Sequence, residues 1–253
     1  MDITIDRVQN RKQLREFIRF PHELYRGNEY WVPALEAGEY KTFDPSKNDA
    51  FQFCECECYL ARVSGKTVGR VAAVLNTKSN QRWNEDAVRF GWLDFIENQL
   101  VLDALLAAVE DFASRHGCRI IKGPLGFTEM DRTGLLVDGF NHLSSFTCLY
   151  NYPYYGEMLQ KAGFAKDTDW IQRSLDVPGQ MPKMFDYCPL ITQRYGLRMV
   201  EKCSMRVLAR RYGHKVFQLY NETFAPLYES SPLTDSQINE YMHTYVPIMD
   251  RDF

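Results

Sequence analysis

The sequence lacks the motifs that mark three common kinds of enzyme site. Among its 253 residues there is no G-x-S-x-G elbow, no H-E-x-x-H pair and no Walker A turn. Those motifs hold a nucleophilic serine, a zinc ion and a nucleotide phosphate, respectively. The five histidines stand singly, and none pairs with a cysteine at zinc-finger spacing. The sequence therefore gives no support to a hydrolase, a zinc protease or a P-loop enzyme.

Long apolar runs and an excess of positive charge are also missing. The most apolar window, residues 100–109, contains Asp103 and is about half the length that a membrane span needs. The first ten residues have neither the basic nor the apolar region of a secretory signal. The formal net charge is −3, which leaves no global field to attract a polyanion. We expect a cytoplasmic protein with reduced cysteines, no membrane span and no nucleic-acid partner.

The stretch FCECECYL at residues 53–60 places three thiols close together and raises the question of a metal site. Its alternation predicts a strand, in which residues two apart lie roughly 6.6 Å from each other. Sulfurs around one tetrahedral zinc ion are about 3.8 Å apart, so neighbouring strand thiols cannot share the ion. We therefore predict no metal site, with Cys54, Cys56 and Cys58 buried on one face and Glu55 and Glu57 on the other.

The order of elements predicts an α/β protein, of the α+β kind with a mixed sheet. A strand over 3–8 leads into a helix that opens with an Asn10–Gln13 capping pair and that Pro21 is expected to interrupt. The pattern then predicts a hairpin of strands 53–63 and 67–76 around the turn SGK, followed by a strand over 87–96 with a bulge or close approach at Gly91. A helix from Val101 to a cap at Gly117 comes next, and a short strand ends at Gly123-Pro124. The last elements predicted before residue 178 are a helix over 154–163 and a strand over 169–177.

A composition break at residues 178–182 predicts a boundary between two units, residues 1–177 and residues 178–253. The second unit is predicted to hold a strand over 197–203, a helix over 206–225 and a helix opened by a Thr234–Gln237 capping box. No hairpin follows, so we expect this unit to be an incomplete copy of the first. Apolar surface left exposed by such a unit would favour a homo-oligomer.

Four segments carry a resemblance to a known family: YWVPAL, VGRVAAVLN, GPLGFTEMDRTGLLVDGF and YNYPYYGEMLQKAGF. With the element order, they resemble the GNAT superfamily of acyl-CoA-dependent N-acyltransferases, and in particular uncharacterised bacterial proteins with two GNAT-like units. The resemblance implies an acyl-CoA N-acyltransferase fold over residues 1–177. It also implies acyl transfer from acyl-CoA, for example acetyl-CoA, to a small-molecule amine or a peptide, with no tightly bound cofactor.

The resemblance places donor binding at the turn between the strand 87–96 and the next helix. GNAT enzymes carry a Gln/Arg-x-x-Gly-x-Gly/Ala turn there, whose backbone N–H groups cradle the pyrophosphate. In this sequence the turn reads ENQLVLDALL and contains no glycine, so close approach of a diphosphate is not supported. Asn98 and Gln99 in this turn, together with Asn151, are the expected donor-binding residues.

The same resemblance suggests the catalytic groups. Glu97 is the candidate base for the amine, and a tyrosine on the helix 154–163 would be the acid toward the thiolate. The usual tyrosine position is Leu159 here, so we assign the acid to Tyr155, one helical turn earlier on the same face. The alternative is that Glu97 is an exposed loop residue and Tyr155 a packing aromatic.

The irregular stretch 123–151 has the densest polar group near a predicted strand end, where ligands of open α/β sheets bind. We take Thr128, Asp131 and Tyr154 as candidate substrate-binding residues. Two functions stay open at this point. The chain is an acyl-CoA-dependent N-acyltransferase, or it is a non-catalytic GNAT-like scaffold that has lost acyl-CoA binding.

Overall fold

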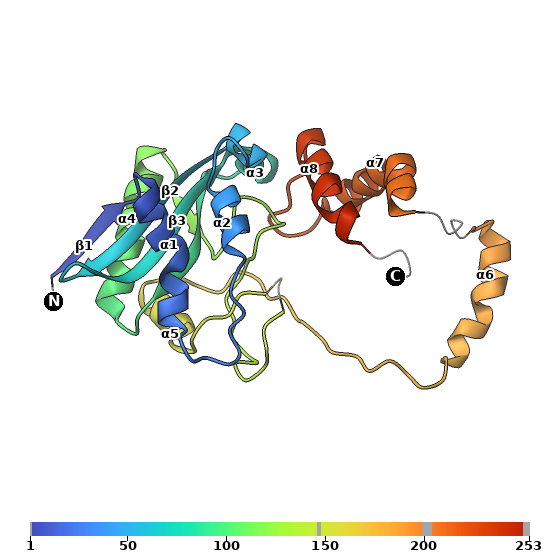
Figure 1. Cartoon of the computed structure of the whole chain (residues 1–253), viewed down its shortest axis with the longest axis horizontal. Helices are drawn as coiled ribbons and strands as arrows, with labels where there is room; N and C mark the ends of the chain where they lie inside the picture. The colour runs from blue at the N-terminus through green and yellow to red at the C-terminus, as the bar shows by residue number, and fades with distance from the viewer. Residues whose placement is uncertain (1, 146–147, 199–203, 250–253) are drawn as a thin grey trace. The chain divides into compact units, whose positions relative to one another are not determined.

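The computed structural model describes residues 2–145, 148–198 and 204–249 (Figure 1). The chain divides into two compact units: Met1–Lys166 with Leu219–Gln237, and Asp167–Gln218 with Ile238–Phe253. The first unit therefore includes a segment from the C-terminal part of the chain. The boundary that the sequence suggests at residue 178, and a second GNAT-like unit after it, stay predictions.

A five-stranded mixed sheet forms the centre of the first unit. Its strands lie side by side in chain order: β1 (Ile3–Arg7), β2 (Cys54–Val63), β3 (Lys66–Asn76), β4 (Ala87–Phe95) and β5 (Ile120–Lys122). Neighbours are antiparallel except β4 and β5, which are parallel. The predicted hairpin is confirmed, because Ser64 and Gly65 both have positive φ, 50° and 78°, as a two-residue turn of type I′ requires.

Helices pack on both faces of the sheet (Figure 1). One face holds α1 (Arg11–Leu24) and the segment of α2 (Glu36–Thr42), and the other holds α4 (Gln99–Arg115) and α5 (Tyr154–Lys161). A 3-10 helix, η1 (Asp49–Gln52), precedes β2, and α3 (Thr77–Trp83) follows β3. The second unit contains η2 (Lys183–Tyr187), α6 (Cys188–Tyr195) and η3 (Val246–Ile248), while α7 (Met205–Phe224) and α8 (Asp235–Tyr245) cross the boundary between the units.

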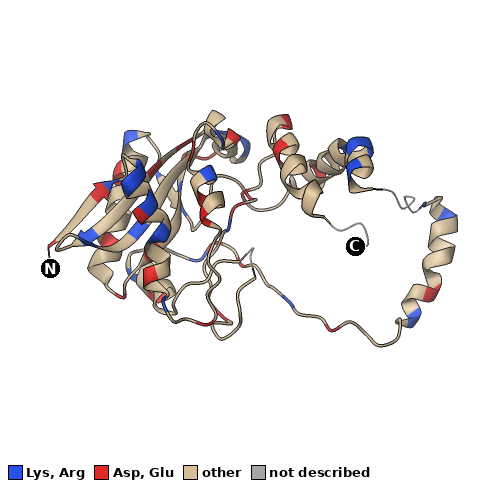
Figure 2. Cartoon of the chain, viewed as in Figure 1, with Lys and Arg blue, Asp and Glu red and all other residues tan. Residues whose placement is uncertain are grey.

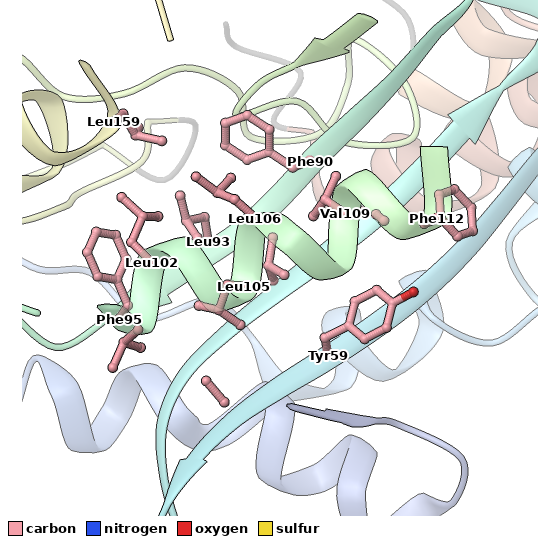
Figure 3. Packing of buried hydrophobic residues seen from close by; sticks show 14 of the residues in the cluster. Tyr59, Phe90, Leu93, Phe95, Leu102, Leu105, Leu106, Val109, Phe112 and Leu159 are labelled. Atoms are coloured by element: carbon pink, nitrogen blue, oxygen red, sulfur yellow. The ribbon is translucent and has the colours of Figure 1, made fainter. Parts of the chain in front are cut away.

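The α4 face carries the larger core (Figure 3). The apolar side chains of α4 recur at one-, three- and four-residue steps and so form one stripe. This stripe packs on apolar residues of β4: Leu102, Leu105, Leu106, Val109 and Phe112 against Phe90, Leu93 and Phe95. All of these side chains are buried. The predicted strand and long helix are thereby confirmed, and the helix ends where Gly117 has a φ of 69°.

The first helix differs from the prediction, because it continues through Pro21 to Leu24. Proline has no N–H, so the carbonyl of Phe17 loses its helical donor. The guanidinium of Arg70 replaces that donor at 2.8 Å. A residue 53 positions away in sequence thus satisfies the carbonyl that proline leaves without a donor.

One other expectation is wrong, and one side chain in β2 is more buried than a glutamate usually is. Residues 169–177 form no strand; they lie exposed and without regular structure, because apolar alternation does not by itself provide a partner strand. Glu57 lies on the face of β2 opposite the cysteines, as predicted, and its side chain is buried there. Its carboxylate is bonded to Arg115 at 2.8 Å and to Arg7 at 3.1 Å, which offsets the desolvation.

The remaining details follow short-range rules. The thiols of Cys54 and Cys58 are buried in β2 and that of Cys56 is partly buried. Side chains of the Thr234–Gln237 box bond both backbone N–H groups, at 2.9 and 3.2 Å.

The predicted strand 197–203 falls mainly on residues 199–203, outside the described part of the chain. Within the described ranges, no helix combines the length and apolar character needed to cross a bilayer.

Gly91 tests the packing of this fold. A Cβ at this position would lie 2.5 Å from the carbonyl oxygen of Leu125, a backbone atom that cannot move aside. We expect Gly91→Ala to lower the free energy of unfolding by about 1–3 kcal/mol. The control is Gly38→Ala in α2, where nothing lies within 4 Å and alanine should stabilise by up to about 1 kcal/mol. Urea denaturation of both variants measures the difference, and equal stabilities would contradict the close approach.

Candidate functional site

Strands β4 and β5 separate after a short pairing. Their ladder covers Ala87–Arg89 and Ile120–Lys122, and the last contact beyond it is the bond from the Leu125 N–H to the Phe90 carbonyl at 2.7 Å. From Trp92 to Phe95, β4 has no strand neighbour on this side in the described part of the chain. We call this half of β4 the open edge.

The open edge begins at a bulge. Trp92 has a φ of 47°, which is unfavourable for a bulky residue, and the register to β3 shifts between Arg70 and Ala72. The strain is held from the α2 side, since the Trp92 indole donates to Glu39 at 2.8 Å and its ring contacts Phe43 with a centroid distance of 4.8 Å. A bulge of this kind redirects backbone groups and is often found at functional sites.

The turn at the end of β4 holds three of the predicted residues. Asn98 caps α4, with its side-chain oxygen accepting from the Leu100 N–H at 2.9 Å. Gln99 donates to Asp103 at 2.8 Å and to the Met158 carbonyl at 3.1 Å. Glu97 is exposed beside them. A diphosphate does not fit this turn in the GNAT manner, because there is no glycine, the cap occupies a helix N–H, and Glu97 adds negative charge.

A buried hydroxyl network lies next to the turn. Tyr155 accepts from the Phe95 N–H at 3.1 Å, and its oxygen lies 3.1 Å from that of Tyr25. Tyr25 in turn donates to Asp94 at 2.8 Å. The hydrogen of Tyr155 therefore points to Tyr25, and the chain of bonds ends on the carboxylate. Burial, together with the nearby charge of Asp94, raises the pKa of both tyrosines well above 10 and keeps them neutral.

Tyr154 binds the same strand end. Its hydroxyl donates to the Phe95 carbonyl at 2.5 Å, so Tyr154 and Tyr155 together take both backbone polar groups of one residue. The structure thus brings Glu97, Asn98, Gln99 and the two tyrosines to one place, the end of β4. Their catalytic and binding roles stay predictions.

The loop after β5 crosses to the other end of β4. The Phe127 carbonyl accepts from Asn76 at 2.8 Å and from Arg89 at 3.4 Å. Arg89 and Phe95 are six residues apart in β4, or roughly 20 Å at about 3.3 Å per residue. Thr128 and Asp131 therefore lie away from the turn at the end of β4, and their substrate-binding role is a separate prediction.

Asp131 holds this loop together. Its carboxylate accepts from the Thr128 N–H at 2.9 Å, and Gly126 is needed because a Cβ there would lie 2.3 Å from that of Asp131. Burial raises the pKa of Asp131 to about 6, and the charge of Glu39 contributes to the rise. The negative charge of Glu39 therefore acts on Asp131, and Glu39 is also bonded to the Trp92 indole.

Asn151 is buried and uses its amide inside the loop. It accepts from the Leu136 N–H at 2.7 Å and donates to the Leu136 carbonyl at 3.1 Å and the Tyr152 carbonyl at 3.0 Å. These bonds fix the loop end, and a role in donor binding stays a prediction.

Sequence reasoning missed a polar cluster that the C-terminal part of the chain completes. Glu229 accepts from Arg89 and from Lys122, each at 2.8 Å. Burial works to raise its pKa, but Lys122 and Arg89 hold that pKa below the ordinary value. Residues 107 and 140 positions apart meet here, and no local pattern in the sequence signals such a pairing.

Glu129 lies in the same region. Its Oε2 accepts from the N–H and hydroxyl of Ser231 at 3.4 and 3.5 Å, while its buried Oε1 has no hydrogen-bond partner among the described residues. Burial raises the pKa of this carboxyl. The density of polar residues in the loop was the signal that could have identified it.

No family model matches the sequence. Over 222 residues, the chain is 27% identical to Protein YghO of Escherichia coli (strain K12), an alignment that covers 85% of this chain and 53% of that protein. Over 260 residues, it is 23% identical to the bacterial ceramide synthase of Caulobacter vibrioides (strain NA1000 / CB15N), covering 99% of this chain and 65% of that protein. The chain thus spans between about half and two thirds of the length of these relatives.

Among solved structures, a tandem GNAT protein from the clavulanic acid biosynthesis pathway is 13% identical, with 64% of this chain and 43% of that chain covered and a TM-score of 0.43. Other structural neighbours are acetyltransferases of similarly low identity. The element order and the mixed sheet of the first unit are those expected from the GNAT resemblance.

The hydroxyl of Tyr155 gives a stability prediction. Tyr155→Phe leaves the buried Phe95 N–H without its acceptor, so the free energy of unfolding should fall by about 1–3 kcal/mol. Tyr195→Phe serves as the control, because Tyr195 is exposed, and should change little. Urea denaturation of both variants measures the effect, and an unchanged stability of Tyr155→Phe would show that the network contributes nothing.

The raised pKa of Asp131 gives a prediction on pH. The folded state holds this proton up to about pH 6, whereas the unfolded state releases it near its ordinary value. The stability that the proton confers is complete below about pH 4 and is lost as the pH rises through about 6. The Asp131→Asn variant should therefore gain stability relative to the wild type between these pH values.

The matched control is Asp138→Asn, which changes an exposed aspartate of the same loop. Thermal unfolding of the three proteins across the pH range gives the comparison. Parallel pH profiles for the wild type and Asp131→Asn would contradict the raised pKa.

Proposed function

We propose that this chain, which has the fold of the GNAT acyltransferase superfamily, takes part in acyl transfer from an acyl thioester to an amine. The observation that carries the proposal is the open edge of β4, which begins at the strained Trp92. The Trp92 indole is bonded to the carboxylate of Glu39, and Asp131 packs on Gly126, which lies against Gly91 just before Trp92. The tyrosines take both backbone polar groups of Phe95, so the stretch from Trp92 to Asp94 is the part of this edge that can hold an extended chain through backbone hydrogen bonds. A strained residue at its start can aim a backbone group at the reacting carbonyl.

Acyl-CoA is the donor that suits this edge, because its pantetheine arm is an extended chain with two amide groups. The turn before α4 supplies no glycine cradle for the diphosphate, so the arm and the acyl group have to supply most of the donor affinity. Most of the affinity for the donor would therefore come from contacts with the open edge. A long-chain acyl-CoA should therefore bind more tightly than acetyl-CoA, because a longer acyl group adds apolar contact.

The acceptor amine is cationic at neutral pH, and two carboxyl groups beside the bulge are suited to attract it. Glu39 is held there by the Trp92 indole, and Asp131 has a pKa of about 6, close to the value that favours a general base at neutral pH. In this proposal Asp131 takes the proton of the amine, and the carboxylate of Glu39 attracts and orients the cationic amine. Glu97 remains the competing base, and Tyr155 the predicted acid, with its hydrogen directed to Tyr25.

The relative named a bacterial ceramide synthase suggests the acceptor to test. A ceramide is the amide of a fatty acid and a long-chain amino alcohol, so we propose a long-chain amine as the acceptor class, ahead of the more general small-molecule amine or peptide. The proposal concerns the whole protein to which such a chain belongs. A second GNAT-like unit beginning after residue 178 is part of it.

One observation favours the alternative of a non-catalytic GNAT-like scaffold. The N–H of Leu100 at the start of α4 is already bonded by the Asn98 side chain, and no glycine lies in that turn. A module that does not bind acyl-CoA would have this turn. Calorimetry with acetyl-CoA and palmitoyl-CoA separates the two functions, since binding of neither would favour the scaffold.

The carboxyl pair gives the activity prediction. With radiolabelled palmitoyl-CoA and a long-chain amino alcohol, Glu39→Gln and Asp131→Asn should each lower kcat/KM by about 10²-fold, the usual contribution of a positioned base or charge. Glu97→Gln is the matched control and should keep most of the activity. If Glu97→Gln is the inactive variant instead, the base assignment made from the sequence is right and the one made here is wrong.

A further inference from the structure

A groove lies between α1 and the turn that joins β2 to β3. Its volume is about 820 Å³, within the range of small-molecule sites. Helix α1 supplies one wall, with Lys12, Arg15 and Glu23, and the β2–β3 turn supplies the other, with Ser64 and Lys66. Every one of these residues belongs to the first unit.

Only some of the cationic side chains along this groove form ion pairs. Arg19 is bonded to Glu36 at 2.9 Å. By contrast, Lys12, Arg15 and Lys66 form no ion pair among the residues that the structure describes, and all three are exposed. Figure 2 shows Lys and Arg residues repeated along α1, and spacings of three and four place Lys12, Arg15 and Arg19 on one face of the helix.

The acidic side chains near the groove act on Lys12 and Arg15 only at longer range, because their direct bonds go to other groups. Glu16 is bonded to Arg62 at 2.6 Å and also accepts from the Thr67 hydroxyl. Arg62 is in turn bonded to Asp6 at 2.6 Å. Glu23 is the one other carboxylate that lines the groove. The floor is thus a paired network with fixed geometry, and an excess of free positive charge stands on the rim.

We infer that this groove binds a phosphate group. Three unpaired cations on one concave surface repel each other, and a multiply charged anion between them relieves that repulsion. The protein as a whole carries a net charge of −3, so the cluster is a local feature rather than a consequence of a basic chain. Ser64 adds a hydroxyl donor at the rim of the groove.

The phosphate can belong to a soluble phosphorylated compound or to the headgroup of an anionic phospholipid. Both have the same chemistry at the groove, and they differ in what surrounds the phosphate. The inference does not rest on acyl transfer, because none of the lining residues belongs to the open edge or to the carboxyl pair of Glu39 and Asp131.

The test uses the full chain and inorganic pyrophosphate, with binding followed by calorimetry at low salt. The double variant Lys12→Glu, Arg15→Glu should bind about tenfold more weakly or not at all, because two attractions become repulsions. The matched control is Arg119→Glu, Lys161→Glu, which changes the net charge equally at two exposed cations outside the groove. It should bind as the wild type does.

Sedimentation with vesicles distinguishes the two sources. Binding to vesicles that contain phosphatidylglycerol, but not to pure phosphatidylcholine, with loss in the groove variant alone, identifies a phospholipid headgroup. Binding of pyrophosphate without vesicle binding identifies a soluble phosphate compound. Failure of the wild type to bind pyrophosphate and vesicles, or an equal loss in both double variants, overturns the inference. Circular dichroism of each variant confirms that the fold is retained.

Discussion

The buried ion pair of Arg70 and Asp94 is the interaction on which the arrangement of the first unit depends. Its atoms are 2.7 Å apart, and it joins β3 to β4. The same arginine bonds the Phe17 carbonyl that Pro21 leaves free in α1. The same aspartate accepts from Tyr25, which continues to Tyr155 on α5. One pair of charges therefore orients two strands and two helices, and a buried charge left alone would be costly.

This network lies directly behind the open edge of β4. Asp94 and Phe95 belong to that edge, and Tyr154 and Tyr155 bond both polar groups of Phe95. The edge is therefore held rigidly at one end by hydroxyl groups and at the other by the bulge at Trp92. A site that has to receive an extended ligand benefits from such support, because the ordering does not have to occur on binding.

A second set of charges closes the opposite end of the sheet. Glu229 returns from the C-terminal part of the chain to Arg89 on β4 and Lys122 on β5. Through these bonds, the short ladder between β4 and β5 is reinforced beside the place where the two strands separate. The position of the separation is thus set by ion pairs at one end and by the close approach of Gly91 to Leu125 at the other.

Most of the elements that the sequence predicted are decided by neighbours within a few residues. The hairpin around Ser64 and Gly65, the capping pairs at Asn10 and Thr234, and the stripe of α4 all depend on spacings of two to four. The short helices α2 and α3 were missed because seven residues are too few to show a period. The predicted strand 169–177 was wrong because alternation does not reveal whether a partner strand exists.

The candidate site divides in the same way. The sequence by itself determined which residues stand at the end of β4, since Glu97, Asn98 and Gln99 simply follow the strand. Tertiary structure alone decided that Tyr155 is enclosed, that Glu39 meets Trp92, and that Glu229 pairs with Arg89. Those contacts join residues 53 to 140 positions apart, and a charge or hydroxyl carries no local sign of the partner that folding will bring to it.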